Sequence, residues 1–193
     1  MGRLIYFILA SLDGYIEDAQ GQFGWARPDV EVFEFVTDLV RAVSTYLYGR
    51  RMYETMLYWE TVPLDEGMTA YDRAFTERWR AAEKVVYSRT LPSVSSARTR
   101  LERDFEPDAV RRLKQATSGD LTVAGAELAG RALRAGLVDE LQLMVVPVIV
   151  GGGKPWLPHG ARVDLELRES RRFSSGDVFL RYRPKAEVAG ALR

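Results

Sequence analysis

Short apolar runs alternate with segments of helical periodicity along most of this chain of 193 residues. Residues 4–10 (LIYFILA) form a continuous apolar run before a turn, which is typical of a strand covered on both faces. Residues 29–43 place Val32, Val36 and Val40 on one face at helical spacing. Strands that alternate with helices predict a mostly parallel sheet. Further strands are expected at residues 45–48, 84–87, 98–101, 121–123 and 140–150, and further helices at 69–82, 107–116 and 126–135.

The last part of the chain has a different pattern. Apolar and charged residues alternate over 164–170, and Val178, Leu180 and Tyr182 alternate with their neighbours in the same way. The sequence SSGD at 174–177 predicts a turn between them, so we expect an antiparallel hairpin added to the parallel sheet. The expected architecture is a three-layer α/β fold. At roughly 100–200 residues per domain, residues 1–185 are expected to form a single domain, with 186–193 as a frayed tail.

Composition excludes several classes of function. Lys plus Arg and Asp plus Glu both number 27, and this balance argues against nucleic-acid binding. Cysteine is absent and His159 is the only histidine, so we expect no disulfide, thiol nucleophile or metal site. No apolar stretch reaches the roughly 18 residues that a membrane span needs, and the apolar N-terminus predicts a buried strand rather than a signal peptide. We therefore expect a cytoplasmic protein that acts on a small molecule.

Four turns follow predicted strands, and in open α/β sheets ligands bind outside the carboxyl ends of the strands. The first turn, at residues 11–16 (SLDGYI), carries Asp13. The second, at 48–55, carries Gly49, which lets a backbone approach closely, together with Arg50 and Arg51. Taken alone, each turn is also compatible with an ordinary capped turn and solvated side chains.

The other two turns also suit an anion. Ser88 and Arg89 follow a strand and combine a hydroxyl with a guanidinium, which suits a phosphate monoester. Residues 123–128 (VAGAEL) predict a strand, a turn of small residues and a helix, which offers backbone N–H groups to an anion. This spacing is not the three-glycine fingerprint of the Rossmann fold. The GGGK at 151–154 is not a P-loop, because Pro155 follows it in place of Ser or Thr.

Together, the order and spacing of these motifs are far more specific than any one of them. They resemble the dihydrofolate-reductase-like family, and within it the reductase domain of riboflavin biosynthesis and its stand-alone relatives. The resemblance covers residues from about 4 to about 183, nearly the whole chain. The matching segments are residues 11–16, 49–54 (GRRMYE), 88–89, 123–128, 136–141 (GLVDEL) and 147–153 (PVIVGGG).

The resemblance implies NADPH as the cofactor. Gly49 and Arg50 would lie along it, with Arg50 near the 2′-phosphate of the adenosine. Ser88 and Arg89 would flank the same phosphate and the adenine. Two arginine-bearing turns favour NADPH over NADH, because only NADPH carries the extra phosphate.

The remaining positions are assigned by the same resemblance. The residues after the fourth turn would place a helix N-terminus under the pyrophosphate, the first turn would border the nicotinamide, and the glycine-rich turn would line the floor of the cleft. The expected additional cofactor contacts are Leu12, Arg51, Ala124, Gly125, Ala126, Glu127, Leu128, Gly151 and Gly152.

The implied reaction is hydride transfer to a C=N or C=O of a pterin-like or ribosylamino-pyrimidine substrate, as in 5-amino-6-(5-phosphoribosylamino)uracil reductase. A carboxylate near the acceptor would deliver or relay the proton. We expect Asp13 in this role, with Asp29 and Glu31 as further candidates. Asp13 and Trp25 are the expected substrate contacts.

Two alternatives and one assembly state remain open at this stage. The chain has Met52 where dihydrofolate reductases usually carry Thr, and Ala124-Gly125 where they carry two glycines. A dihydrofolate reductase proper and a non-catalytic nucleotide-binding module are the alternative functions. The resemblance and the apolar run at 141–150 suggest a homodimer, although a central strand would explain the same run.

Overall fold

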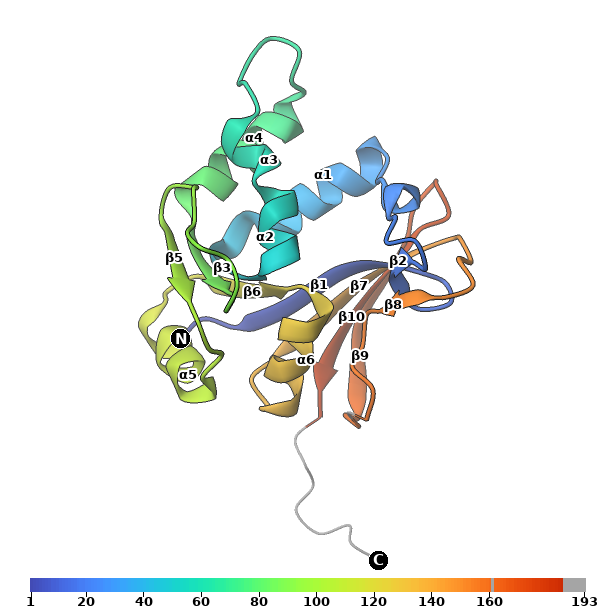
Figure 1. The fold of residues 1–193 in the computed structure, drawn as a ribbon. Helices are drawn as coiled ribbons and strands as arrows, with labels where there is room; N and C mark the ends of the chain where they lie inside the picture. Colours follow the sequence, from blue (N-terminus) through green and yellow to red (C-terminus); the bar gives the residue numbers. More distant parts are fainter. Residues whose placement is uncertain (161, 186–193) are drawn as a thin grey trace, which may run out of the picture.

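The computed structural model describes residues 1–160 and 162–185 (Figure 1). The expected tail at 186–193 lies outside the described residues. The described chain folds around one large sheet, and a small two-stranded sheet stands beside it. No helix in the described residues is both long enough and apolar enough to cross a membrane.

The large sheet has eight strands in the order β5-β4-β3-β6-β1-β7-β10-β9. The first six in this order run parallel to their neighbours, whereas β10 is antiparallel to both β7 and β9. The expected C-terminal hairpin on a parallel sheet is therefore confirmed. The bounds are β1 Leu4–Ser11, β3 Val43–Gly49, β4 Glu83–Tyr87, β5 Thr99–Glu102, β6 Asp120–Ala124, β7 Glu140–Val146, β9 Leu165–Arg172 and β10 Val178–Pro184.

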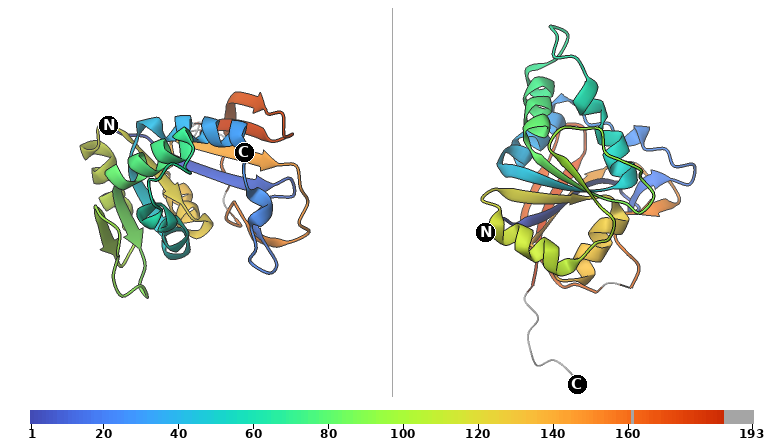
Figure 2. Two further views of the ribbon diagram at one scale, coloured as in Figure 1. Left: turned by 90° about the horizontal axis from the view of Figure 1, so that it is seen from above. Right: turned by 60° about the vertical axis from the view of Figure 1, so that its left-hand side comes forward.

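Helices cover both faces of this sheet, which gives the expected three layers (Figures 1 and 2). One face packs against α1, α2 and α4 through a core that includes Tyr48, Tyr53 and Trp79. The other face packs against α5 and α6 through Val110 and Ala129. The helices are α1 Val30–Leu39, α2 Arg50–Met56, α3 Tyr58–Thr61, α4 Ala70–Ala81, α5 Pro107–Ala116 and α6 Ala126–Arg134, with 3₁₀ turns η1 at Gly24–Ala26 and η2 at Val40–Ala42.

Two expected elements are shorter than the periodicity indicated. The helix expected over 29–43 ends at Leu39, because η2 follows and β3 already begins at Val43. The strand expected over 140–150 ends at Val146. Pro147 follows it and lacks a backbone N–H, and the N–H of Val148 turns back to the carbonyl of Val146 at 2.8 Å.

The segment 11–28 is rich in Gly, Asp and Gln, which predicts a long loop, but it contains one short strand. Residues Tyr15–Asp18 form β2, which pairs with β8 at Gly153–Pro155 in an antiparallel ladder. Gly153 allows this approach, because a Cβ at that position would lie 2.0 Å from the carbonyl oxygen of Glu17. The partner strands are far apart in sequence and too short for a periodic pattern, so periodicity could not reveal the pairing.

Candidate functional site

The turns singled out in the sequence gather at the carboxyl edge of the sheet, where β1, β3, β4, β6 and β7 end (Figure 1). The second and fourth turns touch: a Cβ at Gly125 would lie 3.7 Å from the backbone nitrogen of Gly49. They meet because β3 and β6 are neighbours, with Tyr48 opposite Ala124. Two of the glycine turns that the resemblance assigns to the cofactor thus lie side by side.

Gly125 is the N-cap of α6, and its φ of +98° lies in the region that favours glycine. Within residues 1–160 and 162–185, no side chain caps the N-terminus of this helix. The first-turn N–H groups of Ala126, Glu127 and Leu128 have no acceptor within the helix, and the helix dipole adds positive potential there. This terminus can therefore receive an anion.

Gly49 differs from Gly125 because the fold does not require a glycine there. Its φ of −73° suits any residue, and a Cβ would meet no atom within 4 Å. The space beside Gly49 is open, and the residue ends β3 and is the N-cap of α2. The backbone at Gly49 is therefore open to the close approach of a ligand.

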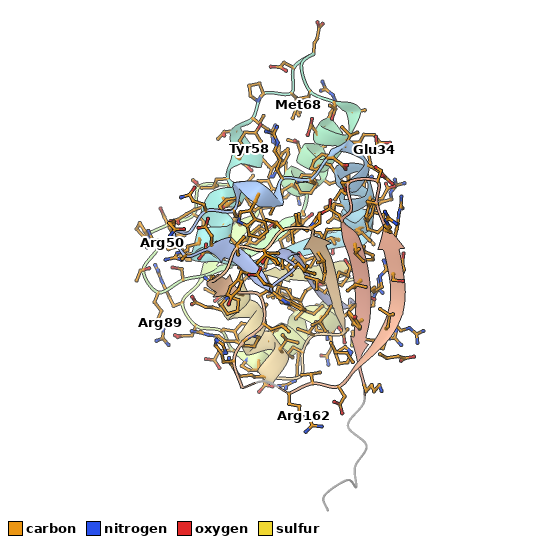
Figure 3. The ribbon with its side chains drawn as sticks, turned by 90° about the vertical axis from the view of Figure 1, so that its right-hand side faces the viewer. Glu34, Arg50, Tyr58, Met68, Arg89 and Arg162 are labelled. Atoms are coloured by element: carbon orange, nitrogen blue, oxygen red, sulfur yellow. The ribbon has the colours of Figure 1, made fainter. Side chains whose placement is uncertain are left out.

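Arg50 joins the second turn to the third. Its guanidinium donates to Thr90 Oγ1 at 3.0 Å and to Glu54 Oε1 at 2.8 Å. Thr90 therefore adds a hydroxyl beside Arg50 that the sequence reasoning missed. Only its position next to Ser88-Arg89 could have suggested it. Arg50 and Arg89 project on the same side of the molecule (Figure 3).

Ser88 and Arg89 have partners within the protein. The buried Ser88 hydroxyl accepts the N–H groups of Thr90 at 3.3 Å and Leu91 at 3.0 Å, so it shapes the turn. The exposed Arg89 guanidinium pairs with Asp104 at 2.8 Å through Nε. A phosphate here would compete with Asp104 for Arg89.

Asp13 fastens the first turn to the glycine-rich turn. Its carboxylate accepts the N–H of Gly151 at 2.8 Å and the N–H of Val150 at 3.2 Å. The side chain of Ser11 and these backbone N–H groups hold the pKa of Asp13 below its ordinary value. Asp13 is thus a carboxylate at neutral pH and holds the Gly151 turn in place.

Two exposed apolar side chains stand at this edge. Leu12 is 65% exposed and Ile149 is 71% exposed. The two strand ends are tied together, because the N–H of Leu12 donates to the carbonyl of Val148 at 2.8 Å. Leu12 was expected at the nicotinamide, whereas Ile149 was missed because it lay inside a predicted strand. The pair offers an apolar surface to a planar ring.

A family model described as the RibD C-terminal domain matches residues 3–179. This chain belongs to the RibD C-terminal domain family. The uncharacterized protein YyaP of Bacillus subtilis strain 168 is 30% identical over 182 residues, covering 93% of this chain and 94% of the relative. The uncharacterized protein YwjB of the same strain is 25% identical over 168 residues, covering 86% and 88%. The expected family is therefore confirmed, and membership supports a reductase-like function of the oxidoreductase class.

Solved structures show the same fold. A putative riboflavin biosynthesis protein from Shewanella sp. PV-4 superposes with a TM-score of 0.74 at 21% identity, covering 95% of this chain and 99% of that one. A dihydrofolate reductase from Enterococcus faecalis in complex with NADP(H) superposes with a TM-score of 0.64 at 12% identity, covering 96% of this chain and 98% of that one. The expected dihydrofolate-reductase-like architecture is confirmed.

The other expected carboxylates of this RibD C-terminal domain serve the fold. Asp29 caps α1 and accepts the N–H of Val32 at 2.8 Å. Glu31 binds the turn between β9 and β10, where it accepts the hydroxyl of Ser174 at 2.7 Å and its N–H at 3.1 Å. The Ser174 contacts hold the pKa of Glu31 below its ordinary value. Neither carboxylate bonds to the glycine turns.

Three further expected positions lie around this edge. Trp25 is in η1, and its indole N–H donates to the carbonyl of Gln22 at 3.2 Å. Arg51 is mostly exposed and lies 3.5 Å from Glu17 of β2. Gly152 has a φ of +151° and open space around its Cα, next to the turn that Asp13 holds. Arg51 and Glu17 both line a cavity of about 760 Å³ that reaches Glu127.

Proposed function

We propose that this protein is an NADPH-dependent reductase that transfers hydride to a C=N or C=O of a pterin-like or ribosylamino-pyrimidine substrate. The observation that carries the proposal is the meeting of Gly49 and Gly125 at the uncapped N-terminus of α6. This geometry combines open backbone with free N–H groups, which is what a pyrophosphate needs.

The charged side chains support NADPH as the dinucleotide. Arg50 and Thr90 lie 3.0 Å apart at one end of the glycine turns, and Arg89 projects on the same side. Two guanidiniums and a hydroxyl suit the 2′-phosphate that distinguishes NADPH from NADH. In this proposal Arg89 exchanges Asp104 for the phosphate.

The other end of the turns suits the reacting rings. When bound, NADPH would supply the hydride, while the protein orients the rings and excludes water. Leu12 and Ile149 would provide the apolar surface. By holding the Gly151 turn, Asp13 would fix the distance between Leu12 and Ile149. It would also place a negative charge near the C=N or C=O of the substrate. In its ionised form it could relay a proton from water but does not hold one to donate.

A second candidate is a nucleotide-binding module without turnover. The specific observation in its favour is that Asp13, Asp29 and Glu31 all have partners within the protein. Dihydrofolate reductase proper is less favoured, because the matching family is the RibD C-terminal domain.

The test measures binding and turnover separately. The purified protein is titrated with NADPH and NADH, and NADPH oxidation is then followed with 5-amino-6-(5-phosphoribosylamino)uracil and with dihydrofolate. Tighter binding of NADPH and oxidation with the pyrimidine support the proposed reductase. Binding without oxidation by either acceptor would favour the module, and oxidation with dihydrofolate alone would favour a folate reductase. Failure to bind NADPH would overturn both leading candidates.

We also keep the homodimer and the cytoplasmic location as proposals. The apolar run that suggested a dimer is largely accounted for within one chain, because β7 lies between β1 and β10. Family resemblance therefore supports the dimer more than this run does. Light scattering after size-exclusion chromatography gives the mass directly, and a single-chain mass at micromolar concentration would contradict the dimer.

A further inference from the structure

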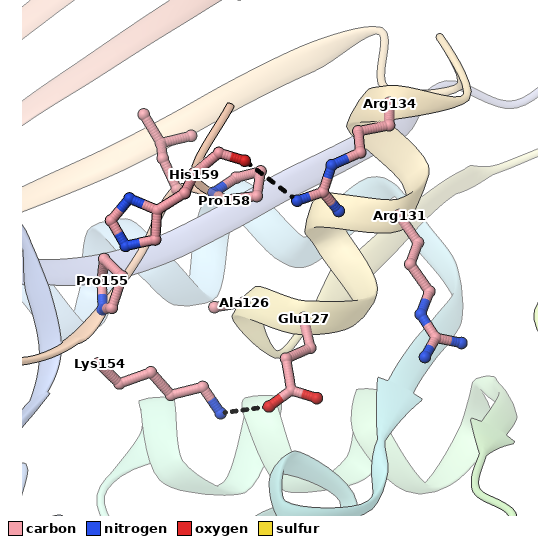
Figure 4. A pocket seen from close by; sticks show the side chains of 9 residues that line it. Ala126, Glu127, Arg131, Arg134, Lys154, Pro155, Pro158 and His159 are labelled. Carbon is pink, nitrogen blue, oxygen red and sulfur yellow. Dashed lines mark hydrogen bonds and ion pairs between the residues drawn. The ribbon is translucent and has the colours of Figure 1, made fainter. Parts of the chain in front are cut away.

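The two ends of the proposed cofactor site are held by different kinds of contact. At the α6 end, Nζ of Lys154 lies 3.4 Å from Oε1 of Glu127, whose side chain is 84% exposed (Figure 4). An exposed ion pair of this kind adds little free energy. At the other end, Ser88 and Arg89 begin a connection whose backbone is bonded to side chains from α2, from α3 and from the residue after β5. The fold itself therefore arranges the adenosine end.

This connection, residues 88–98, is called the 88–98 loop below. It joins β4 to β5, which are parallel neighbours in the sheet. Parallel neighbours are usually joined by a helix, which satisfies most of its own backbone N–H and C=O groups. Residues 88–98 contain no helix or strand. Their polar backbone groups therefore depend on side chains of other segments.

Arg103 holds the first half of the 88–98 loop. Its Nη1 donates to the carbonyls of Ser88 at 3.1 Å and Leu91 at 2.6 Å. Thr90, which accepts a hydrogen bond from Arg50, lies between these two residues. Arg103 therefore determines where the hydroxyl of Thr90 stands relative to Arg50.

Tyr53 holds the second half of the loop from α2, the helix that begins with Arg50. Its side chain is 1% exposed, and its hydroxyl oxygen accepts the N–H groups of Ser95 at 2.8 Å and Ser96 at 3.1 Å. The same oxygen lies 3.2 Å from Oγ of Ser96. The helix and the loop are thus fixed to each other by a buried contact as well as by the exposed contact between Arg50 and Thr90.

We propose that Tyr53 and Arg103 are positioning residues that set the preference of this protein for NADPH over NADH. Neither side chain would contact the dinucleotide. They would hold Arg89 and Thr90 beside Arg50 before a ligand arrives, which lowers the entropic cost of binding. This inference rests on the proposed function, because only NADPH carries the 2′-phosphate that these groups would meet.

Tyr53→Phe tests the inference by removing one oxygen atom and no charge. The N–H groups of Ser95 and Ser96 lose their acceptor, so hydrogen exchange at these amides should be faster in the free protein. If the loop keeps its arrangement about one tenth of the time, the apparent affinity for NADPH falls about tenfold. NADH should lose less, so fluorescence titrations should show the ratio of NADPH to NADH affinity fall about threefold or more.

Arg103→Lys is the second variant, and it keeps the positive charge. An ammonium group lacks the planar fork of the guanidinium, so the affinity ratio should fall in the same direction. Arg73→Lys is its control, because Arg73 also donates to the backbone of a loop, outside the proposed cofactor site. Tyr48→Phe is the control for Tyr53→Phe, because the hydroxyl of Tyr48 is also buried and accepts the indole N–H of Trp79 at 3.0 Å. Both controls should keep the wild-type ratio.

The wild type alone tests the proposed function, and the variants test the inference. Wild-type protein that binds NADPH no more tightly than NADH would contradict the proposed function, and this inference with it. A wild-type preference that persists in folded Tyr53→Phe, or that falls equally in Tyr48→Phe, overturns the inference alone. A full wild-type ratio in Arg103→Lys also overturns it, because charge would then suffice. Circular dichroism checks folding, and Arg103→Lys decides the question if Tyr53→Phe does not fold.

Discussion

The carboxylate of Asp13 accepts the backbone N–H of Gly151 at 2.8 Å, across 138 positions of sequence. This contact joins the end of β1 to the glycine-rich turn after β7 and brings Leu12 and Ile149 to the same edge. A residue expected to handle a proton therefore also holds the glycine-rich turn in position. Replacing it is predicted to affect stability and binding together.

Asp13→Asn tests this role through pH. Because the pKa of folded Asp13 is lowered by Ser11 and the Gly151 turn, its contribution to stability is present above the ordinary Asp pKa of roughly 3.9 and is lost as pH falls through the lowered value. Urea unfolding of wild type and variant should therefore differ at pH 6 to 7 by more than at about pH 2 to 3. A difference that does not change with pH would show that the charge of Asp13 contributes nothing.

Gly49→Ala is predicted to separate binding from folding. The added methyl meets no protein atom within 4 Å, so the free energy of unfolding should change by no more than about 0.5 kcal/mol. The methyl would enter the space proposed for the cofactor, and NADPH affinity should fall about tenfold, equivalent to about 1.4 kcal/mol. Gly24→Ala is the matched control, because its Cβ also meets nothing within 4 Å. Equal NADPH affinity in both variants would argue against a cofactor beside Gly49.

Gly125→Ala should instead destabilise the protein. Its φ of +98° is unfavourable for alanine, and such strain costs about 1–3 kcal/mol. Contacts at 3.7–3.9 Å around the new methyl are ordinary, so the cost comes from the backbone. Thermal unfolding measures this cost as the difference in melting temperature between Gly125→Ala and Gly49→Ala. Identical melting temperatures would mean that the turn relaxes without strain.

Arg50→Gln is predicted to change the choice of dinucleotide. Loss of the guanidinium beside Thr90 should lower the affinity for NADPH about tenfold or more. The affinity for NADH, which lacks the 2′-phosphate, should change little. Fluorescence titrations with both dinucleotides measure the ratio of the NADPH and NADH affinities. Arg41→Gln removes an exposed arginine of η2 and serves as the control. An equal loss for NADPH and NADH would place Arg50 away from that phosphate.

Gly153→Ala is predicted to break the small sheet. The new Cβ would overlap the carbonyl of Glu17 at 2.0 Å, and the φ of +139° adds backbone strain. The free energy of unfolding should therefore fall by about 3 kcal/mol or more. Gly21→Ala isolates the strain, because its φ is +75° and the space around it is open. Guanidinium unfolding compares the two. Similar losses would show that β8 can move away from β2.

The sequence by itself determined the order of the main strands and helices along the chain and the positions of the glycine turns. These features depend on short-range physics: hydrophobic periodicity sets the type of element, and the conformational freedom of a residue such as Gly125 sets where the chain can turn. The motif order was specific enough to indicate the family before the chain was folded. The mostly parallel core followed from the same alternation, whereas the spatial order of the strands came only from the structure.

Only the tertiary structure decided which side chains are available for chemistry. Asp29 caps α1, Glu31 accepts a hydrogen bond from the β9–β10 turn, and Asp13 accepts the N–H of Gly151. Thr90 accepts a hydrogen bond from Arg50, 40 positions away in the sequence, and β2 pairs with β8. Hydrogen bonds between distant segments form only when the packed core brings those segments together, so no local pattern carries them.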